Sequence, residues 1–154
     1  MKRHYHWLGT PGFSVVWIPQ GGDEGSVVVG GGGGKVKSGV VNRLIIAPFS
    51  WASNPVDNAT AIHDTGDDVC LGLVPHPSLP GVICALLRRR VALLRVSEDA
   101  TAVEELASFT GDFLEAEDES SLQSACWVSP RDLATGGEDG MVRLWRVGGV
   151  LEGG

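Results

Sequence analysis

One segment near the end of the chain constrains the fold more than any other, because it contains a complete series of short strands and tight turns. Residues 124–147, SACWVSPRDLATGGEDGMVRLWRV, begin with an apolar strand and continue through a turn at SPRD into a strand of small residues, LATGG. Asp139-Gly140 then favours a tight hairpin, because both central residues of such a turn need positive φ. The segment predicts three antiparallel strands, the last of which carries Trp145.

This order of strands and turns resembles a WD repeat, the unit that forms one blade of a β-propeller. Ala134, Gly136 and Gly137 are small where propeller sheets converge near the axis, and Trp145 is expected to fill the gap toward the neighbouring blade. The usual Trp-Asp pair reads Trp145-Arg146, and the Gly-His signature is absent, so the repeat is degenerate. Since a blade buries its faces only against neighbours, one blade is not expected to be stable alone.

Short β-branched segments between Gly, Pro, Asn and Asp clusters recur through the rest of the chain. Glycine accounts for 22 of the 154 residues, which agrees with many turns. The window 98–109, EDATAVEELASF, is expected to be a helix, because Ala102, Leu106 and Phe109 share a helical face. The predicted class is all-β, with nine strands at residues 13–18, 26–30, 42–48, 68–74, 81–87, 90–96, 124–128, 132–137 and 141–147.

The length of the chain limits how much of a propeller it can form. At about 40–45 residues per repeat, 154 residues hold about three blades, whereas closed propellers have about 4–8. The prediction is therefore one incomplete WD-repeat β-propeller over residues 1–154. Its expected parts are a first blade with a Gly-rich loop at 9–48, a second blade at 60–97, a helical and acidic connection at 98–121 and a WD-type blade at 122–149.

Charge disfavours nucleic acid as a partner. The formal net charge is −7, whereas a nucleic-acid binder normally presents a basic face to the phosphates. The basic run Arg88-Arg89-Arg90 lies between two apolar segments and is expected to be a hairpin turn.

The cysteines and the hydropathy of the chain indicate the cellular compartment in which the protein is expected. Cys70, Cys84 and Cys126 each lie in an apolar run and are expected to be buried, reduced thiols, which indicates a cytosolic environment. The first residues lack the apolar core of a signal peptide. No run of 18 apolar residues occurs, so no part of this chain is expected to cross a bilayer, and the chain alone is expected to be soluble and cytoplasmic.

A run of five glycines, Gly30 to Gly34, precedes Lys35 and invites comparison with a phosphate-binding loop. A P-loop would need glycine where Val29 stands and Ser or Thr where Val36 stands. The run is also followed by the strand-like NRLII and not by a helix whose amides could face an anion. The glycines are therefore expected in a long loop between two strands.

The glycine run is followed by Gly39-Val40-Val41-Asn42 and the strand RLII, and the chain later contains LATGGEDGMVRLW. This combination resembles the endoplasmic-reticulum exchange factors that activate the Sar-type small GTPase, the prolactin regulatory element-binding protein family. The opening LGTPGFSVVWIP and the acidic connection from FTGDF into the WD blade agree with that family. The resemblance covers most of the chain and is specific at about 29–44 and 109–147. The family has seven blades, a C-terminal membrane anchor and usually four glycines; here there are about three blades, no anchor and five glycines.

The resemblance implies guanine-nucleotide exchange without covalent chemistry, which starts COPII vesicle formation in ER-to-Golgi transport. It implies action at the cytosolic face of the endoplasmic reticulum, with membrane contact only through an anchor absent from this chain. In the family this loop binds a potassium ion and projects into the nucleotide site of the GTPase. Val40 would be the apolar tip and Asn42 a further contact. The implied potassium ligands are main-chain carbonyls and one side-chain amide, from Gly31, Gly32, Gly33, Gly34, Gly39 and Asn42.

Three other interpretations remain open at this point. The chain could be a binding-only WD scaffold in which the glycine loop is an inert hairpin tip. It could be a hydrolase or transferase that uses His63 with Asp64, Asp67 and Asp68, although the segment HDTGDD is expected to be a turn before the next strand. Or it could be unable to fold without further blades.

Overall fold

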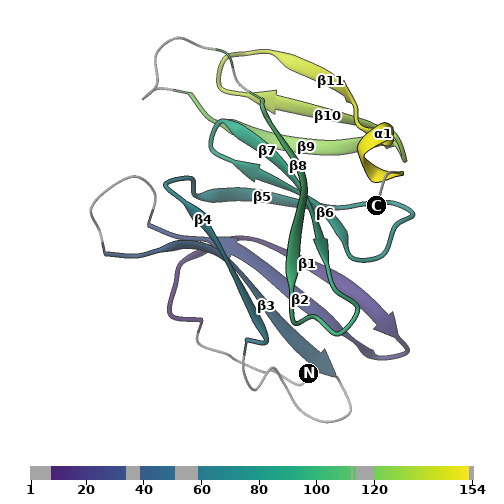
Figure 1. Ribbon diagram of the computed structural model, residues 1–154. Helices are drawn as coiled ribbons and strands as arrows, with labels where there is room; N and C mark the ends of the chain where they lie inside the picture. Colours follow the sequence, from purple (N-terminus) through teal and green to yellow (C-terminus); the bar gives the residue numbers. More distant parts are fainter. Residues whose placement is uncertain (1–7, 34–38, 51–58, 112, 114–119, 153–154) are drawn as a thin grey trace, which may run out of the picture.

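A computed structural model describes residues 8–33, 39–50, 59–111, 113 and 120–152. These residues form three antiparallel sheets (Figure 1). The first sheet contains β1 (Gly12–Gly21), β2 (Glu24–Gly31), β3 (Asn42–Ser50) and β4 (Ala61–Gly66) in chain order. The second contains β5 (Cys70–Pro75), β6 (Val82–Leu87), β7 (Arg90–Val96) and β8 (Val103–Thr110), also in chain order.

The third sheet has three described strands, β9 (Leu122–Ser129), β10 (Asp132–Gly137) and β11 (Val142–Arg146), and the short helix α1 (Gly148–Leu151) follows it. In the part of the chain that the structure describes, no helix is long and apolar enough to cross a membrane.

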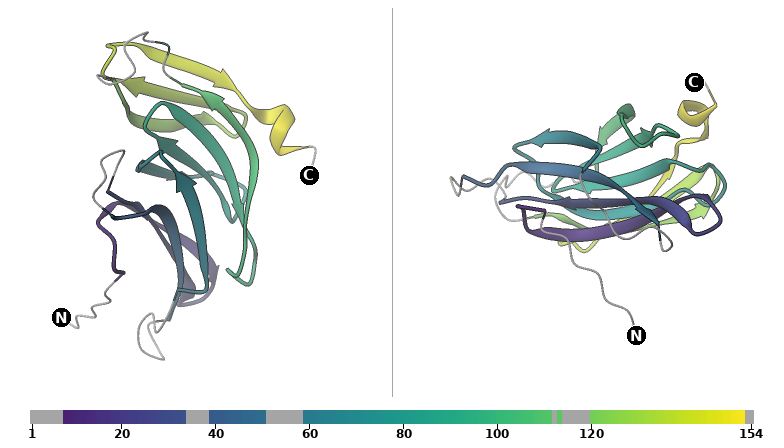
Figure 2. Two further views of the ribbon diagram at one scale, coloured as in Figure 1. Left: turned by 60° about the vertical axis from the view of Figure 1, so that its left-hand side comes forward. Right: turned by 90° about the horizontal axis from the view of Figure 1, so that it is seen from below.

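The sheets follow one another along a curved stack (Figure 2). The first strand of each sheet contacts the first strand of the next, β1 with β5 and β5 with β9, as inner strands do in a propeller. We call the side of a sheet that faces the preceding sheet its front face, and the side that faces the following sheet its back face. With this definition, each junction in the molecule joins one back face to one front face.

Two apolar cores hold these junctions together. The first lies between the first and second sheets and includes Val28 and Leu44 from one side and Ile83 and Leu94 from the other. The second lies between the second and third sheets, where Leu93 is buried in the same cluster as residues of the following sheet. Because both of its faces are covered, the second sheet has strands β6 and β7 that are almost continuously buried.

The third sheet confirms the prediction made from its sequence. Asp139 Oδ1 accepts a hydrogen bond from the Met141 amide at 2.9 Å, and Gly140 has a φ of 74°, so the β10–β11 hairpin closes where Asp-Gly predicted it. The Trp145 ring lies 4.7 Å from the ring of Phe109 on β8, centroid to centroid, and its Nε1 donates to Thr135 Oγ1 at 2.8 Å. Trp145 therefore fills the gap toward the neighbouring sheet, as expected.

The helix expected over residues 98–109 is wrong, because residues 103–110 form strand β8. β8 pairs with β7, where Ala107 is opposite Leu93 and Glu105 is opposite Leu94, so Leu106 is an extra residue in a β-bulge. The bulge returns Leu106 and Phe109 to the same face, and both pack against the second core. A three-residue spacing on one face, which indicated a helix, is here the product of a bulged strand.

Residues 61–66 form β4 at the edge of the first sheet, so the first part of HDTGDD belongs to a strand that was not expected. The expected turn follows at its end, where the Asp68 amide donates to the Thr65 carbonyl oxygen at 3.4 Å before β5 begins. Strand β4 alternates between exposed and covered positions and carries His63 and Asp64, since an outer strand packs on one side and tolerates polar residues on the other. Consequently the first sheet spans 12–66 and the second 70–110, so the predicted second blade at 60–97 begins with a strand of the first sheet and omits β8.

The basic run forms a hairpin as predicted, since Arg88 and Arg89 make the turn between β6 and β7. Among the cysteines, Cys70 and Cys84 are buried as expected, and desolvation raises the pKa of each thiol to about 12. Cys126 is exposed, which corrects the expectation for that residue. It lies on β9 opposite Ala134, on the back face of the third sheet, and no described strand covers that face.

Candidate functional site

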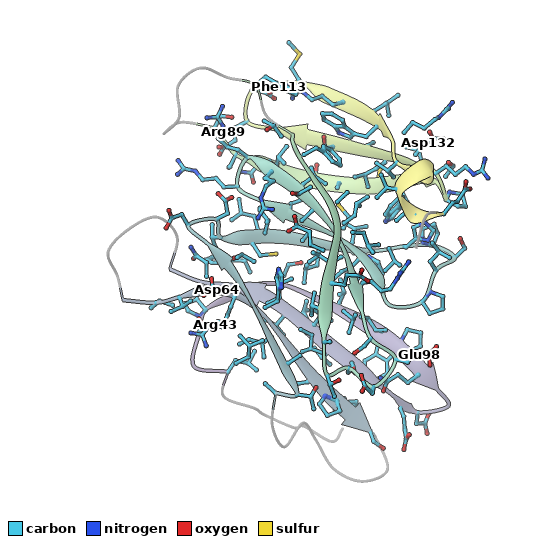
Figure 3. All side chains as sticks on the ribbon, in the orientation of Figure 1. Arg43, Asp64, Arg89, Glu98, Phe113 and Asp132 are labelled. Atoms are coloured by element: carbon cyan, nitrogen blue, oxygen red, sulfur yellow. The ribbon has the colours of Figure 1, made fainter. Side chains whose placement is uncertain are left out.

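The glycine-rich loop connects β2 to β3 at one end of the first sheet. Gly31 is the last residue of β2 and is paired with Arg43 of β3. Arg43 is opposite Asp64 of β4, and the two lie together near the start of the loop (Figure 3). The loop therefore leaves the sheet at a point where all four strands are paired, which fixes the position of its base.

The first glycines of the run are needed for close packing. A Cβ on Gly30 would collide with Sγ of the buried Cys70, and a Cβ on Gly31 would collide with the Pro11 carbonyl oxygen. The Gly32 amide donates to that same oxygen at 3.0 Å. The entry segment at Pro11 therefore closes over the base of the loop, and only glycine fits beneath it.

Asn42 lies at the other side of the base, where β3 begins, and it is 4% exposed. Its Nδ2 donates to the Gly66 carbonyl oxygen at 3.0 Å, which ties the base to the end of β4. Its Oδ1 faces Gly32, so closely that a Cβ on Gly32 would overlap it. Gly32 has a φ of 145°, a conformation that glycine adopts most easily.

The predicted ligands divide into three groups. The structure brings Gly31, Gly32 and Asn42 together at the base, with Gly33 directly after them. Gly39 has a φ of 74° and open space where a Cβ would be, so it belongs to the returning limb of the loop. Gly34 lies outside the described residues.

The returning limb exposes a different valine from the one that the sequence singled out. Val40, the expected apolar tip, is half-buried, whereas the next residue, Val41, is 44% exposed. The Val41 carbonyl accepts a weak hydrogen bond from Thr10 Oγ1 at 3.4 Å, which links the limb to the entry segment. The sequence does not indicate which of these two adjacent valines faces outward.

At its described base the site offers neutral oxygens, with Arg43 and Asp64 on the adjoining strands. The Asn42 carbonyl is held at the base by the hydrogen bond of its own amide nitrogen to Gly66. Neutral carbonyl oxygens beside glycines, which have no Cβ to hinder the approach of an ion, suit a weakly hydrated monovalent cation such as potassium, so these residues fit the implied ion. Within the described residues, no group of three or more His, Cys, Asp and Glu side chains is placed to hold a metal.

The acids of HDTGDD have structural contacts in this arrangement. Asp64 Oδ1 accepts a hydrogen bond from the Gly66 amide at 2.7 Å, in the turn after β4. Asp68 Oδ2 lies 3.6 Å from Arg90 Nε, and Arg90 also pairs with Glu105 at 3.1 Å. These contacts close the turn and join the end of β4 to the second sheet.

A separate hollow of about 510 Å³ lies at the opposite end of β2 from the loop. Ile18 and Ser26 line it from the first sheet and Val96 from the second. Gln20 Nε2 donates to the Glu98 carbonyl oxygen across it at 2.7 Å. Its lining carries no arrangement of acid, base and nucleophile, so we assign no chemistry to it.

No protein-family model matches the chain, and no curated protein matches it. Solved structures do match. One is a chain from a structure of COPII on membranes, the outer coat vertex, with a TM-score of 0.67 and 16% identity over 93% of this chain and 36% of that one. Another, from the COPII coat assembled on membranes, has a TM-score of 0.67 and 16% identity over 93% of this chain and 20% of that one.

This chain thus spans about a third and a fifth of the two chains it matches. At 16% identity the similarity is one of fold. It shows that the three sheets are consecutive blades of an incomplete β-propeller of the WD type.

Proposed function

We propose that the chain is the loop-bearing part of a guanine-nucleotide exchange factor for a Sar-type small GTPase, acting in COPII vesicle formation at the cytosolic face of the endoplasmic reticulum. The observation that carries the proposal is the anchored base of the glycine loop, where Asn42 is fixed by Gly66 and directs its carbonyl oxygen toward Gly32. The sequence resemblance at residues 29–44 supplies the class of partner. The match to COPII coat structures agrees with the fold that this class has.

The proposed mechanism is exchange by differential binding. A factor that binds the nucleotide-free GTPase more tightly than the GDP-bound form shifts the population toward release of GDP. A loop that is rigid at its base and apolar at its outer limb suits this task, because it can hold a contact surface in place. We assign that contact to Val41 together with Val40, since Val41 is the more exposed of the two.

Potassium would be held by the main-chain carbonyls of the glycines and by the Asn42 amide oxygen. The ion would supply positive charge that fixes the loop carbonyls in one conformation. Gly31 and Gly32 contribute by packing under Pro11, which keeps the backbone at the base in one place. Gly39 permits the left-handed turn by which the chain returns to β3.

The test is release of a fluorescent GDP analogue from a Sar-type GTPase, with and without the full chain, in potassium and in lithium buffers. We expect faster release with the chain in potassium and less acceleration in lithium. Val41→Asp should reduce the acceleration about tenfold or more, as loss of a central interface contact does. Val150→Asp is the matched control, because Val150 is 42% exposed on α1, outside the loop.

A second variant tests the base of the loop. Gly33→Val combined with Asn42→Ala should abolish exchange. Thermal unfolding of the double variant distinguishes a lost loop from a lost fold, because Asn42 also bonds to Gly66. A folded wild-type chain that leaves GDP release unchanged would contradict the proposal.

The second candidate is a binding-only WD scaffold. It is favoured by the packing role of Gly30, Gly31 and Gly32, which accounts for part of the glycine run without any ligand. In that case the GTPase or another coat component would bind equally well to wild type and to the Gly33→Val, Asn42→Ala variant, and neither would accelerate exchange.

A further inference from the structure

The hollow at the end of β2 that lies away from the glycine loop contains a polar group without a partner. Ser26 lines this hollow and is fully buried, and its Oγ makes no hydrogen bond within the described residues. Ser26 is opposite Ile18 of β1 and lies two residues before Val28, and both of these side chains belong to the first core. The Ser26 side chain therefore points between the first and second sheets, toward the hollow. A buried hydroxyl without a partner is unfavourable, so a ligand that bonds to it gains free energy.

This hollow of about 510 Å³ adjoins a second one of about 260 Å³, and together they form a groove between the first two sheets. Ile18, Pro19, Pro80 and Gly81 line both hollows. Leu79 lines the second hollow and is 37% exposed, so an apolar side chain there is available to a ligand. Alternate side chains of an extended peptide point the same way, so two neighbouring hollows suit a peptide that inserts one apolar side chain into each.

The rim of the groove is negatively charged. Segments 17–26, 75–82 and 96–99 form the groove and its rim, and they contain four exposed acidic residues and no Lys or Arg. The acids are Asp23, Glu24, Glu98 and Asp99. Glu98 lines the first hollow and lies beside the end of β1 (Figure 3). Hydrogen bonds from Ser97 and Thr101 hold the pKa of Asp99 below its ordinary value of 3.8, so this carboxylate is ionised at neutral pH. A rim of this sign is complementary to a basic partner.

We propose that the groove binds an extended peptide segment of a partner protein, with apolar residues at alternate positions and Lys or Arg between them. The apolar side chains enter the two hollows, and the long basic side chains reach the acids at the rim. The main chain of the peptide supplies N–H and C=O groups that can bond to the Ser26 hydroxyl. Gln20 Nε2 donates to the Glu98 carbonyl oxygen across the first hollow at 2.7 Å, and because Gln20 is exposed an entering peptide can displace its side chain.

The groove lies at the opposite end of β2 from the glycine loop, so the proposal does not rest on nucleotide exchange. Its negative rim also disfavours phosphate-bearing partners, because these need a basic surface. Peptide binding can therefore be measured on the full chain without a GTPase.

The first test is fluorescence anisotropy of short labelled peptides titrated with the full chain. The probe alternates leucine and lysine, one comparison peptide alternates leucine and glutamate, and the other alternates alanine and lysine. We expect the leucine–lysine peptide to bind about tenfold more tightly than either comparison peptide, because each of these lacks either the charge or the apolar side chains. Equal binding of the leucine–lysine and alanine–lysine peptides would overturn the proposal, since the attraction would then come from charge alone.

Two variants test whether the peptide lies in the groove. Ser26→Ala should weaken binding of the leucine–lysine peptide about two- to tenfold, as loss of one hydrogen bond does. The same change should leave the melting temperature of the free chain unchanged or raised, because it removes a buried hydroxyl that has no partner. Glu98→Gln should weaken binding several-fold and reduce its salt dependence, while the main chain of residue 98 still accepts the bond from Gln20.

Ser124→Ala and Glu138→Gln are the matched controls, because both residues are exposed and belong to the third sheet or its turn. Neither change should alter the affinity for the leucine–lysine peptide. A Ser26→Ala chain that binds this peptide as tightly as wild type would overturn the proposal, as would equal weakening by Glu98→Gln and Glu138→Gln. A wild-type chain that binds none of the three peptides would also overturn it.

Discussion

The second and third sheets are built from similar strands but differ in what covers them. In the second sheet β6 is buried at every position, because the first core covers one face and the second core covers the other. In the third sheet β11 alternates between exposed and half-buried residues, because one face alone packs against a neighbour. The difference teaches that burial in this fold depends on having a blade on each side, and not on the apolar content of the strand itself.

The largest expected effect is a difference in stability between two leucine variants, one in the second sheet and one in the third. Leu93→Ala should lower the free energy of unfolding by about 2–5 kcal/mol, because Leu93 is fully buried between the second and third sheets. Leu144→Ala should change it by about 0.5 kcal/mol or less, because Leu144 is 74% exposed. Chemical denaturation of both variants measures the difference. Equal losses would mean that the back face of the third sheet is covered in solution.

A smaller difference in stability is expected between two glycine variants. One glycine lies at the junction of the first and second sheets, and the other lies on the back face of the third sheet. Gly30→Ala should cost about 1–3 kcal/mol, because its Cβ would collide with Sγ of the fully buried Cys70. Gly136→Ala should be neutral or stabilise by up to about 1 kcal/mol, since alanine is favoured over glycine within a strand. Its Cβ would meet Ser124 Oγ at 3.3 Å, and that exposed hydroxyl can rotate away. Thermal melts of the two variants check the contrast.

The sequence predicted the parts of the fold that depend on local chemistry. The Asp139-Gly140 hairpin and the Arg88-Arg89 turn form where they were expected. Trp145 packs toward its neighbour as the WD pattern indicated. Both missed strands, β4 and β8, are the outermost strands of their sheets, where partial exposure removes the continuous apolar signal. In β8 the bulge at Leu106 also produced a helix-like spacing that depends on pairing with β7.

The sequence selected residues of the candidate loop but not their contacts. The sequence motif selected Gly31, Gly32 and Asn42, and the structure places them together at the loop base. The hydrogen bond from Asn42 to Gly66 could not be foreseen, because it joins residues 24 positions apart through a strand that was not recognised. The packing of Gly31 beneath Pro11 is equally non-local. Whether the loop binds potassium stays a prediction.

The smallest expected effect is a pH dependence at the edge of the open sheet. Asp132 accepts hydrogen bonds from Arg146 Nε at 2.9 Å and Ser129 Oγ at 2.8 Å, and these hold its pKa below the ordinary value of 3.8. A carboxyl whose folded pKa is lowered stabilises the fold above the unfolded value, and this contribution is lost as the pH falls through the folded value. Between about pH 5 and pH 2, wild type should therefore lose slightly more stability than Asp132→Asn. Acid titrations followed by circular dichroism measure this difference.

Glu152→Gln is the control for that measurement, because it removes one negative charge at the same end of the third sheet, where Glu152 pairs with Arg131. It should leave the acid-dependent loss at Asp132 in place.

Since the second sheet is held by buried apolar contacts on both faces, its Leu93→Ala loss should be nearly independent of pH over the same range. If Leu93→Ala instead became much milder in acid, polar contacts at the sheet edges would be holding the junctions, and the contrast between the covered and open sheets would need a different physical basis.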